Sequence, residues 1–262
     1  MPSVFENGGI IGKINNYYAP NLIFVGGSAS GVAGTTSDIN FSLTTLTGGV
    51  ASAPADEDLV IAVVCIGSSN DRSYRISGYT QISDIYVNDD EDTNLQIGYK
   101  FMTSTPDTQV TITGGSGSAF DGIAVAFHVW RNVDTTTPFD VTSTESTSLN
   151  TANPNPPAIV PITQGAQIIV AGGSATTLVT TYNTPSDLSN FYTASGADTN
   201  DATVGVGNIP WVNGLYDPVA WTITGADSTA FSSAAVSMVL RPRLVRAGSG
   251  VYNLDAILKG AV

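Results

Sequence analysis

The sequence has few positive charges and a single cysteine. Its 262 residues include nine Lys and Arg against 22 Asp and Glu, which gives a net charge of −13. Such an acidic field repels phosphate backbones, so we expect no nucleic-acid partner. The only cysteine, Cys65, excludes an intrachain disulfide. It lies in the apolar run LVIAVVCI, which indicates a buried small hydrophobe rather than a reactive thiol.

Long hydrophobic segments are also missing. No apolar run reaches the roughly 20 residues that cross a bilayer, so we expect no membrane insertion. The opening MPSVFENGG has neither the basic nor the apolar region of a signal peptide. Charged residues make up 12% of the chain, about half the usual share, and Thr, Ser, Gly and Asn supply the polar surface instead. This composition fits an extracellular or virion protein that is released by lysis.

Catalytic signals are weak. The sole histidine, His128, lies between Phe127 and Val129 in a run that is apolar on both faces, which favours a structural role over acid–base catalysis. No Ser or Cys nucleophile motif is recognisable, and no pair of carboxylates is singled out for glycoside hydrolysis. We therefore predict a protein that is not an enzyme and needs no cofactor, with a polysaccharide depolymerase as a distant alternative.

The densest acidic run is Asp89 to Asp92. Carboxylates bind Ca²⁺, but four adjacent residues in an extended loop point in different directions, and the Gly and terminal Glu of an EF-hand loop are absent. We interpret the run as a solvated hairpin tip and predict no metal site. Asp198 and Asp201 hold the comparable position later in the chain.

Strand patterns dominate the chain, separated by clusters of Gly, Asn, Asp and Pro. Several of them, such as IAVAFHVW and QIIVAGG, are apolar on both faces, which is typical of covered central strands. Strands are predicted at about residues 21–26, 39–46, 59–66, 79–87, 94–102, 108–113, 122–131, 158–162, 167–171, 188–193, 202–207, 219–224 and 232–241.

The second half of the chain resembles the first. Residues 58–131 contain DLVIAVVCIG, QVTITGG and AFDGIAVAFHVWR, and residues 166–241 contain AQIIVAGG, AWTITGA and AFSSAAVSMVLR in the same order. A repeated all-strand unit indicates that neither half buries its apolar face alone. We predict one all-β domain over 21–241, a jelly-roll-like β-sandwich built from two repeat halves. The proline-rich segment 150–157 joins the halves as an extended connector.

The termini differ from this body. Between residues 14 and 240 there are 20 acidic residues against four basic ones, a net of −16, whereas residues 241–262 carry four basic residues against one acidic, a net of +3. We predict an N-terminal docking segment over 1–20 and a C-terminal docking tail over 242–262. The tail contains a short helix whose apolar edge is formed by Leu254, Ile257 and Leu258, and so short a helix needs a surface to pack on.

One loop combines aromatic and acidic residues. In NIPWVNGLYDP, Trp211, Tyr216 and Asp217 lie close together, and aromatic rings beside carboxylates are suited to stacking on sugars. The alternative is that Trp211 closes the end of the sandwich, because large aromatic residues are usually well buried. Trp130 and Trp221 lie within strand patterns and are predicted to be core residues.

Parts of the body resemble a known β-sandwich module. These parts are EDLVIAV at 57–63, SGYT at 77–80, GYKF at 98–101 and WRNVDTTTPFD at 130–140. They are similar to the pattern GDLLV…GWT…YYK…RGVDxxxPID of a module found in tail-fibre and other virion proteins of tailed phages and in some bacterial surface proteins. Glu57 and Asn132 stand where that pattern has Gly, and both positions fall at turns.

The ends resemble a second phage virion pattern, in which GGxIG and ASGVWSL occur close together in sequence. Here they are GGIIG at 8–12, with Ile10 and Ile11, and GSGVYNL at 248–254, where Tyr252 replaces the usual Trp. The body therefore resembles an insertion between the two parts of one docking module.

This resemblance implies a structural component of a tailed-phage virion, exposed on the particle as a tail-fibre, appendage or head-decoration subunit. The implied partners are other virion proteins and further copies of this chain, three by analogy with phage fibres. The alternative function is a lectin-like module that binds host-surface glycans through loops such as 208–218. The two functions are compatible, because virion appendages often carry receptor-binding tips.

Overall fold

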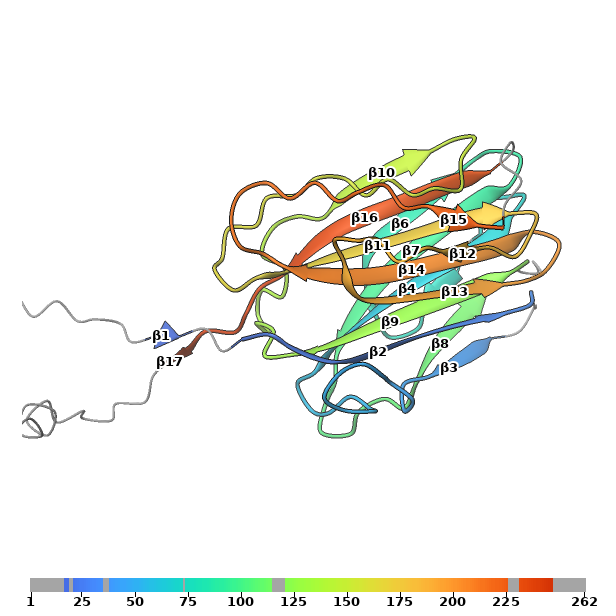
Figure 1. Ribbon diagram of the computed structural model, residues 1–262. Helices are drawn as coiled ribbons and strands as arrows, with labels where there is room; N and C mark the ends of the chain where they lie inside the picture. Colours follow the sequence, from blue (N-terminus) through green and yellow to red (C-terminus); the bar gives the residue numbers. More distant parts are fainter. Residues whose placement is uncertain are drawn as a thin grey trace, which may run out of the picture.

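The computed structural model describes residues 17–18, 21–34, 38–72, 74–114, 121–225 and 231–246, with the backbone alone described for 17–18 and 245–246. Two five-stranded antiparallel sheets pack face to face, so the predicted all-β sandwich is confirmed (Figure 1). In the first sheet the order is β2 (Ile23–Val32), β9 (Ile123–Arg131), β4 (Leu59–Ser68), β7 (Asp92–Phe101) and β6 (Thr80–Val87). In the second it is β10 (Thr144–Ser148), β16 (Ser232–Leu240), β11 (Gln167–Thr176), β14 (Asp201–Pro210) and β13 (Ser189–Gly196).

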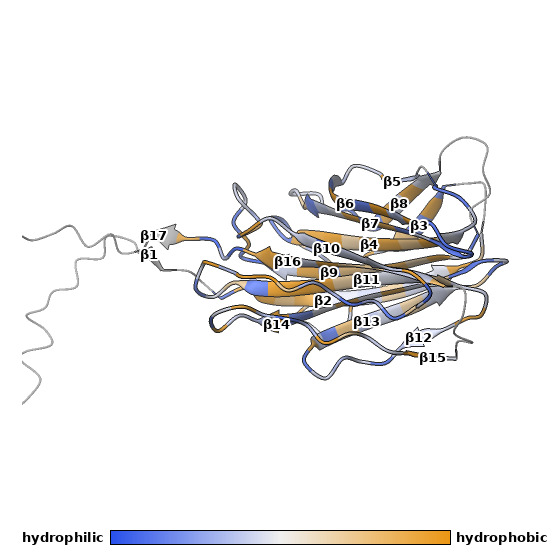
Figure 2. Cartoon of the chain, turned by 90° about the horizontal axis from the view of Figure 1, so that it is seen from above, coloured by the Kyte–Doolittle hydropathy of each residue, from blue (hydrophilic) through white to orange (hydrophobic). Residues whose placement is uncertain are grey.

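A smaller sheet covers the outer face of each large one. The first outer sheet contains β3 (Ile39–Ser42), β8 (Gln109–Gly114) and β5 (Tyr74–Ile76), and the second contains β12 (Thr181–Tyr182) and β15 (Ile223–Thr224). The central strands are therefore covered on both faces, which explains why they are apolar throughout. Figure 2 shows this as hydrophobic colour concentrated on strands such as β4 and β9. One core lies between the two large sheets, and a second and third lie beneath the outer layers.

The two large sheets have the same strand order and a matching register. The four strands β9-β4-β7-β6 of the first sheet correspond in chain order to β16-β11-β14-β13 of the second. Both edge hairpins have a β-bulge at the same level, between Gln81 and Ser83 in β6 and between Ser189 and Tyr192 in β13. The finer expectations, that the halves superpose and that the connections form a jelly roll, stay predictions. The long strands of residues 58–131 all lie in the first large sheet, and those of residues 166–241 all lie in the second.

Some element boundaries were predicted wrongly. Residues 158–162 do not form a strand, because Pro157 and Pro161 have no N–H groups for a ladder, and a single bridge joins Ile159 to Tyr216. Of the strand predicted at 219–224, only β15 (Ile223–Thr224) forms. Five short strands were not predicted: β5, β12 and β10 in the body, and β1 (Tyr17–Tyr18) and β17 (Val245–Arg246) near the termini. Strands β5 and β12 are too short to show a period, and β10, with the sequence TESTS, has no apolar alternation.

The described segments nearest to the two termini lie side by side outside the sandwich. β1 (Tyr17–Tyr18) pairs with β17 (Val245–Arg246), Tyr17 opposite Arg246 and Tyr18 opposite Val245. We call this two-stranded pair the stalk, and the end of the sandwich from which it extends the stalk pole (Figure 1). The opposite end carries the β6–β7 and β13–β14 hairpins, and we call it the hairpin pole.

Candidate functional site

The loop after β14 holds Trp211 against the body. The Trp211 backbone N–H donates to the Ala166 carbonyl at 3.1 Å, and the indole N–H donates to the Gly214 carbonyl at 3.0 Å within the same loop. The ring is half-buried and packs on the core beneath the second outer sheet. Trp211 is therefore partly the plug that the sequence suggested, and its polar atom is already satisfied.

Tyr216 and Asp217 do not complete a shared site with Trp211. The Tyr216 hydroxyl donates to Asp187 Oδ2 at 2.6 Å, and two backbone hydrogen bonds join Tyr216 to Ile159. Burial, followed by the nearby Asp187 carboxylate, raises the pKa of Tyr216. Asp217 is exposed. Sugar binding by these three residues stays a prediction. The hydrogen bonds do not favour it, because the Trp211 indole N–H and the Tyr216 hydroxyl already have partners inside the protein.

The same region exposes apolar side chains near the stalk pole. Val160 and Leu215 lie beside the bridge between Ile159 and Tyr216, and they are 49% and 65% exposed. Ile162 and Val212, in the same two loops, are 67% and 75% exposed. Apolar side chains gathered in this way commonly mark a contact surface. We call Val160, Ile162, Val212 and Leu215 the apolar rim.

The two hairpins at the hairpin pole are acidic turns with matching hydrogen bonds. The Asp89 N–H donates to Asp92 Oδ1 at 2.8 Å, and the Asp198 N–H donates to Asp201 Oδ1 at 2.6 Å. These carboxylates are thus used to hold the turns. Among the described residues, no group of three or more His, Cys, Asp or Glu side chains is arranged to hold a metal ion.

Glu91 is the electrostatic exception in these hairpins. Its carboxylate is partly buried among other acids, and burial, then the charges of Asp121, Asp92, Asp90 and Asp201, raise its pKa to about 6. This makes Glu91 a proton-binding group near neutral pH and a local cost to stability when it is charged.

The buried candidates have structural roles. His128 is fully buried, and its Nε2 lies 2.8 Å from the Asn190 carbonyl, so the ring donates there as the neutral tautomer. Burial lowers its pKa to about 4. Cys65 is also fully buried, and its thiol faces the Ser174 carbonyl at 3.6 Å. The predicted core positions of Trp130 and Trp221 are confirmed, at 2% and 1% exposure.

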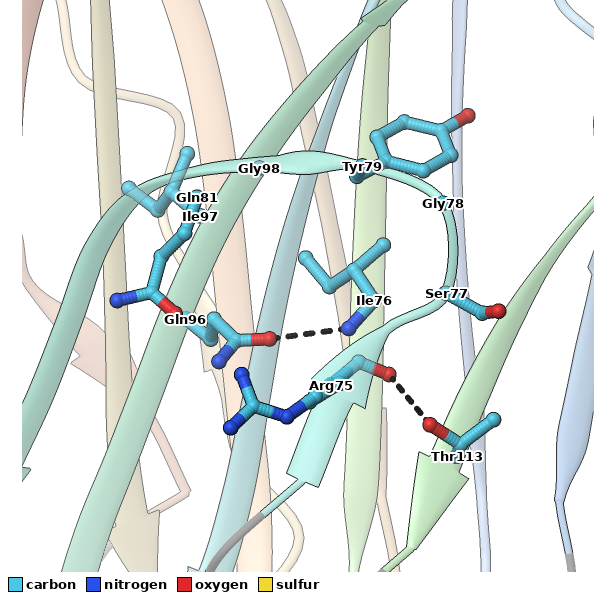
Figure 3. A pocket seen from close by; sticks show the side chains of 10 residues that line it. All are labelled: Arg75, Ile76, Ser77, Gly78, Tyr79, Gln81, Gln96, Ile97, Gly98 and Thr113. Atoms are coloured by element: carbon cyan, nitrogen blue, oxygen red, sulfur yellow. Dashed lines mark hydrogen bonds between the residues drawn. The ribbon is translucent and has the colours of Figure 1, made fainter.

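A polar hollow lies where no site was predicted. It has a volume of about 240 Å³ and lies between the turn after β5 and the edge strand β6. Figure 3 shows the side chains of Arg75, Gln81 and Gln96 on one side of the turn, with the Tyr79 ring turned away from them. A sequence signal existed, because Arg75 is one of four basic residues between 14 and 240 and Gln96 interrupts a buried strand.

The predicted docking residues cannot be placed in the same way. Ile10, Ile11, Tyr252, Leu254, Ile257 and Leu258, together with the short C-terminal helix, lie outside the described residues. No helix long and apolar enough to cross a membrane occurs in the part of the chain that the structure describes.

We compared the chain with protein-family models, with curated proteins and with solved structures, and none of them matches it. Its function therefore has to be inferred from its own residues and geometry.

Proposed function

We propose that this chain is a structural subunit of a tailed-phage virion, anchored through its two ends with the sandwich directed outward. The observation that carries this proposal is the stalk. Residues near both ends of the chain, beside the phage-like motifs at 8–12 and 248–254, leave the body at one pole and pair with each other. A split docking module would need this arrangement, because its two parts have to meet although some 220 residues separate them.

The surface around the stalk supports anchoring at this pole. The apolar rim lies at this end, and Leu244, 56% exposed, leads into β17. The opposite pole carries the two acidic hairpins, whose like charges keep a surface soluble. The hairpin pole also exposes the apolar side chains of Leu149, Leu178 and Val179, so the acidic charge of the hairpins is what distinguishes the two poles, and it suits a solvated end.

The body supports outward projection because its core closes before the stalk begins. Leu240 is fully buried at the end of β16, and Arg241 caps this corner with an ion pair to Asp140 at 3.2 Å. Arg243 makes an exposed pair with Glu57 at 2.5 Å. Residues beyond 243 add no buried side chain to the described core. We further propose that several copies assemble together, three by analogy with phage fibres.

Deletion of residues 244–262 tests the anchoring role. We expect a soluble protein with β-type circular dichroism and cooperative melting, because the core is retained, and we expect that it is not incorporated into particles. Replacing Asp89 and Asp90 by Ala at the hairpin pole is the matched control, and this variant should be incorporated normally. Incorporation of the truncated chain at the wild-type level would refute the docking role, and unfolding of the truncated chain would show that the tail belongs to the core.

A further inference from the structure

Arg75 is unlike the other cationic residues of the body. Among the Lys and Arg side chains that the structure describes, it alone has no hydrogen-bond or ion-pair partner at its charged group, and it is exposed on β5. Arg72 donates to Ser68 Oγ at 2.5 Å, and the other four pair with carboxylates: Lys100 with Asp107, Arg131 with Asp58, Arg241 with Asp140, and Arg243 with Glu57. Arg75 interacts electrostatically with Asp84 without a hydrogen bond between the two side chains, so its N–H groups are available to a ligand.

Two polar hollows meet at Arg75. One, of about 240 Å³, includes Gln81, Gln96 and Ser77 in its lining. The other, of about 260 Å³, is lined by Asp71, Arg72, Tyr74, Arg75, Asp84 and Tyr86. Each is smaller than the roughly 300–1,000 Å³ of ordinary small-molecule sites. Because Arg75 lines both, a ligand that occupied the two together would cross Arg75. We call the two hollows together the Arg75 groove.

The walls of the groove are held in place. Buried Gln96 accepts a hydrogen bond from the Ile76 N–H at 3.1 Å (Figure 3). It also donates to the Tyr74 carbonyl at 3.2 Å, and the two bonds fix β5 against β7. Gly98 also lines the hollow, and a Cβ there would lie 3.1 Å from Tyr79 Cβ and 3.3 Å from Ile76 Cδ1, so the glycine lets the turn after β5 pack closely on β7. The groove is therefore a preformed feature, and a ligand would spend little binding energy on ordering it.

The second half shows that packing does not require a hollow here. By register, Gly205 and Gly207 of β14 correspond to Gln96 and Gly98 of β7. The space above them is filled by Phe191 and Trp221, whose rings meet edge to face at 5.1 Å. Asn190 has a φ of 47°, a left-handed conformation within the β13 bulge, and the following Phe191 packs on the outer core. At this level the first half carries the Gln96 side chain, whereas the second half has Gly205 covered by rings.

The chemistry of the groove favours an uncharged ligand with many hydroxyls. Arg72 and Arg75 donate, Asp71 and Asp84 accept, and Gln81 does both, so formal charges balance along the groove. An anion would gain from the arginines but would meet two local carboxylates and a net charge of −13. A sugar hydroxyl donates and accepts at once, and the Tyr86 ring adds an apolar face beside the polar groups.

We propose that the Arg75 groove binds a neutral sugar residue of a surface polysaccharide, with the Arg75 guanidinium donating to adjacent hydroxyls and Gln81 and Asp84 completing its recognition. This site is separate from the loop 208–218. It also goes beyond the structural role proposed above, because anchoring uses the stalk and does not involve this groove.

An oligosaccharide array tests the proposal with the full-length chain. The array carries neutral hexose and hexosamine oligosaccharides beside carboxylate-bearing ones, and the strongest neutral ligand is then titrated by calorimetry or NMR. We expect the chain to bind one or more of the neutral oligosaccharides. Arg75→Ala should weaken this binding by about tenfold or more, since a hydrogen bond from a charged donor is lost. Gln81→Ala should weaken binding to a smaller extent. Competition by the free monosaccharide distinguishes one bound residue from a longer chain segment.

Control variants separate the groove from the rest of the surface. Arg243→Ala removes the same charge far from the groove and should bind as the wild type does. Because Arg75 is exposed and its charged group makes no hydrogen bond, the melting temperature of Arg75→Ala should be nearly unchanged. The proposal is overturned if the wild type binds no neutral oligosaccharide, if it binds acidic ones alone, or if Arg75→Ala binds normally. Loss of binding in Trp211→Ala but not in Arg75→Ala would assign the site to loop 208–218. Particle incorporation of Arg75→Ala should be normal, so failure of this proposal is distinguishable from failure of the anchoring role.

Discussion

The two halves of the sandwich share a strand arrangement but use different side chains to support it. In the first half, the outer sheet is held over the large sheet by the Gln96 amide, and a polar groove remains. In the second half, the same level is packed with the aromatic rings of Tyr182, Phe191 and Trp221. Strand order and register are therefore compatible with either solution, and the side chains that differ between the halves are the ones to examine for function.

The largest expected difference concerns the aromatic filling of the second half. Trp221 is 1% exposed and packs edge to face on Tyr182 at 5.2 Å. Trp221→Ala should lower the free energy of unfolding by about 3–5 kcal/mol, because a large cavity is left. Val110 is the aligned counterpart of Trp221 in the first outer sheet. Val110→Ala should lower the free energy of unfolding by about 2 kcal/mol. Urea denaturation of both variants measures the difference, and equal costs would contradict the packing described here.

The second comparison pairs His128 of β9 with Met238, which holds the same register in β16. The folded pKa of His128 is about 4, below the ordinary 6.5, so the unfolded chain binds the proton more readily. The wild type should therefore lose stability as the pH falls from 6.5 towards 4, by about 3 kcal/mol from this group. His128→Met should lack this part of the acid sensitivity. Urea unfolding at pH 7 and pH 4 tests it, and parallel pH profiles for the two proteins would show that His128 is not the cause.

A third difference lies at the turns that lead into β4 and β11. Glu57 and Gly165 each lie two residues before their strand, with φ values of 62° and 79°. Glycine adopts this conformation without strain, whereas a residue with a side chain does not. Glu57→Gly should therefore stabilise the fold by about 0.5–1 kcal/mol, since the exposed pair with Arg243 contributes little. Gly165→Glu should destabilise it by a similar amount. Thermal denaturation compares them, and destabilisation by Glu57→Gly would mean that the ion pair outweighs the strain.

The smallest effect is expected at the hairpin tips, where Glu91 corresponds to Asn200. Because burial and neighbouring acids raise the pKa of Glu91 to about 6, its charged form opposes folding above pH 6, and this cost disappears as the pH falls towards 4.5. Glu91→Asn should raise the melting temperature by about 1–2 °C at pH 8 and leave it unchanged at pH 4.5. A gain of the same size at both pH values would point to a cause other than charge.

Strand positions were largely predictable from the sequence, and the outer layers were not. Strands such as β4 and β11 are apolar on both faces, and this pattern can be recognised without knowing how the strands pack. β5 and β12 carry too few residues to show a period, and their place depends on contacts with β8 and β15 from distant parts of the chain. The positions of Glu57 and Asn132, where the resembling pattern has glycine, were predicted to be turns, and both residues have positive φ.

The groove could not be predicted for a related reason. It depends on Arg75, Gln81 and Gln96 from three strands and on the bulge in β6, and sequence spacing does not bring these together. The loop 208–218 was chosen for its residue types, but those types do not reveal that Tyr216 already donates to Asp187. Composition thus indicated where polar and aromatic residues occur, whereas availability to a ligand depended on their partners.

The most direct test of the central proposal is the orientation of the chain on an assembled particle. An antibody fragment raised against the β6–β7 hairpin at Asn88–Glu91 can be bound to particles that contain this chain and imaged by cryo-electron microscopy. If the stalk anchors the subunit, the fragment should decorate the tip of each projection, at the greatest distance from the particle. Density for the fragment at the base of the projection, or no binding because the hairpin pole is covered, would contradict anchoring through the paired ends.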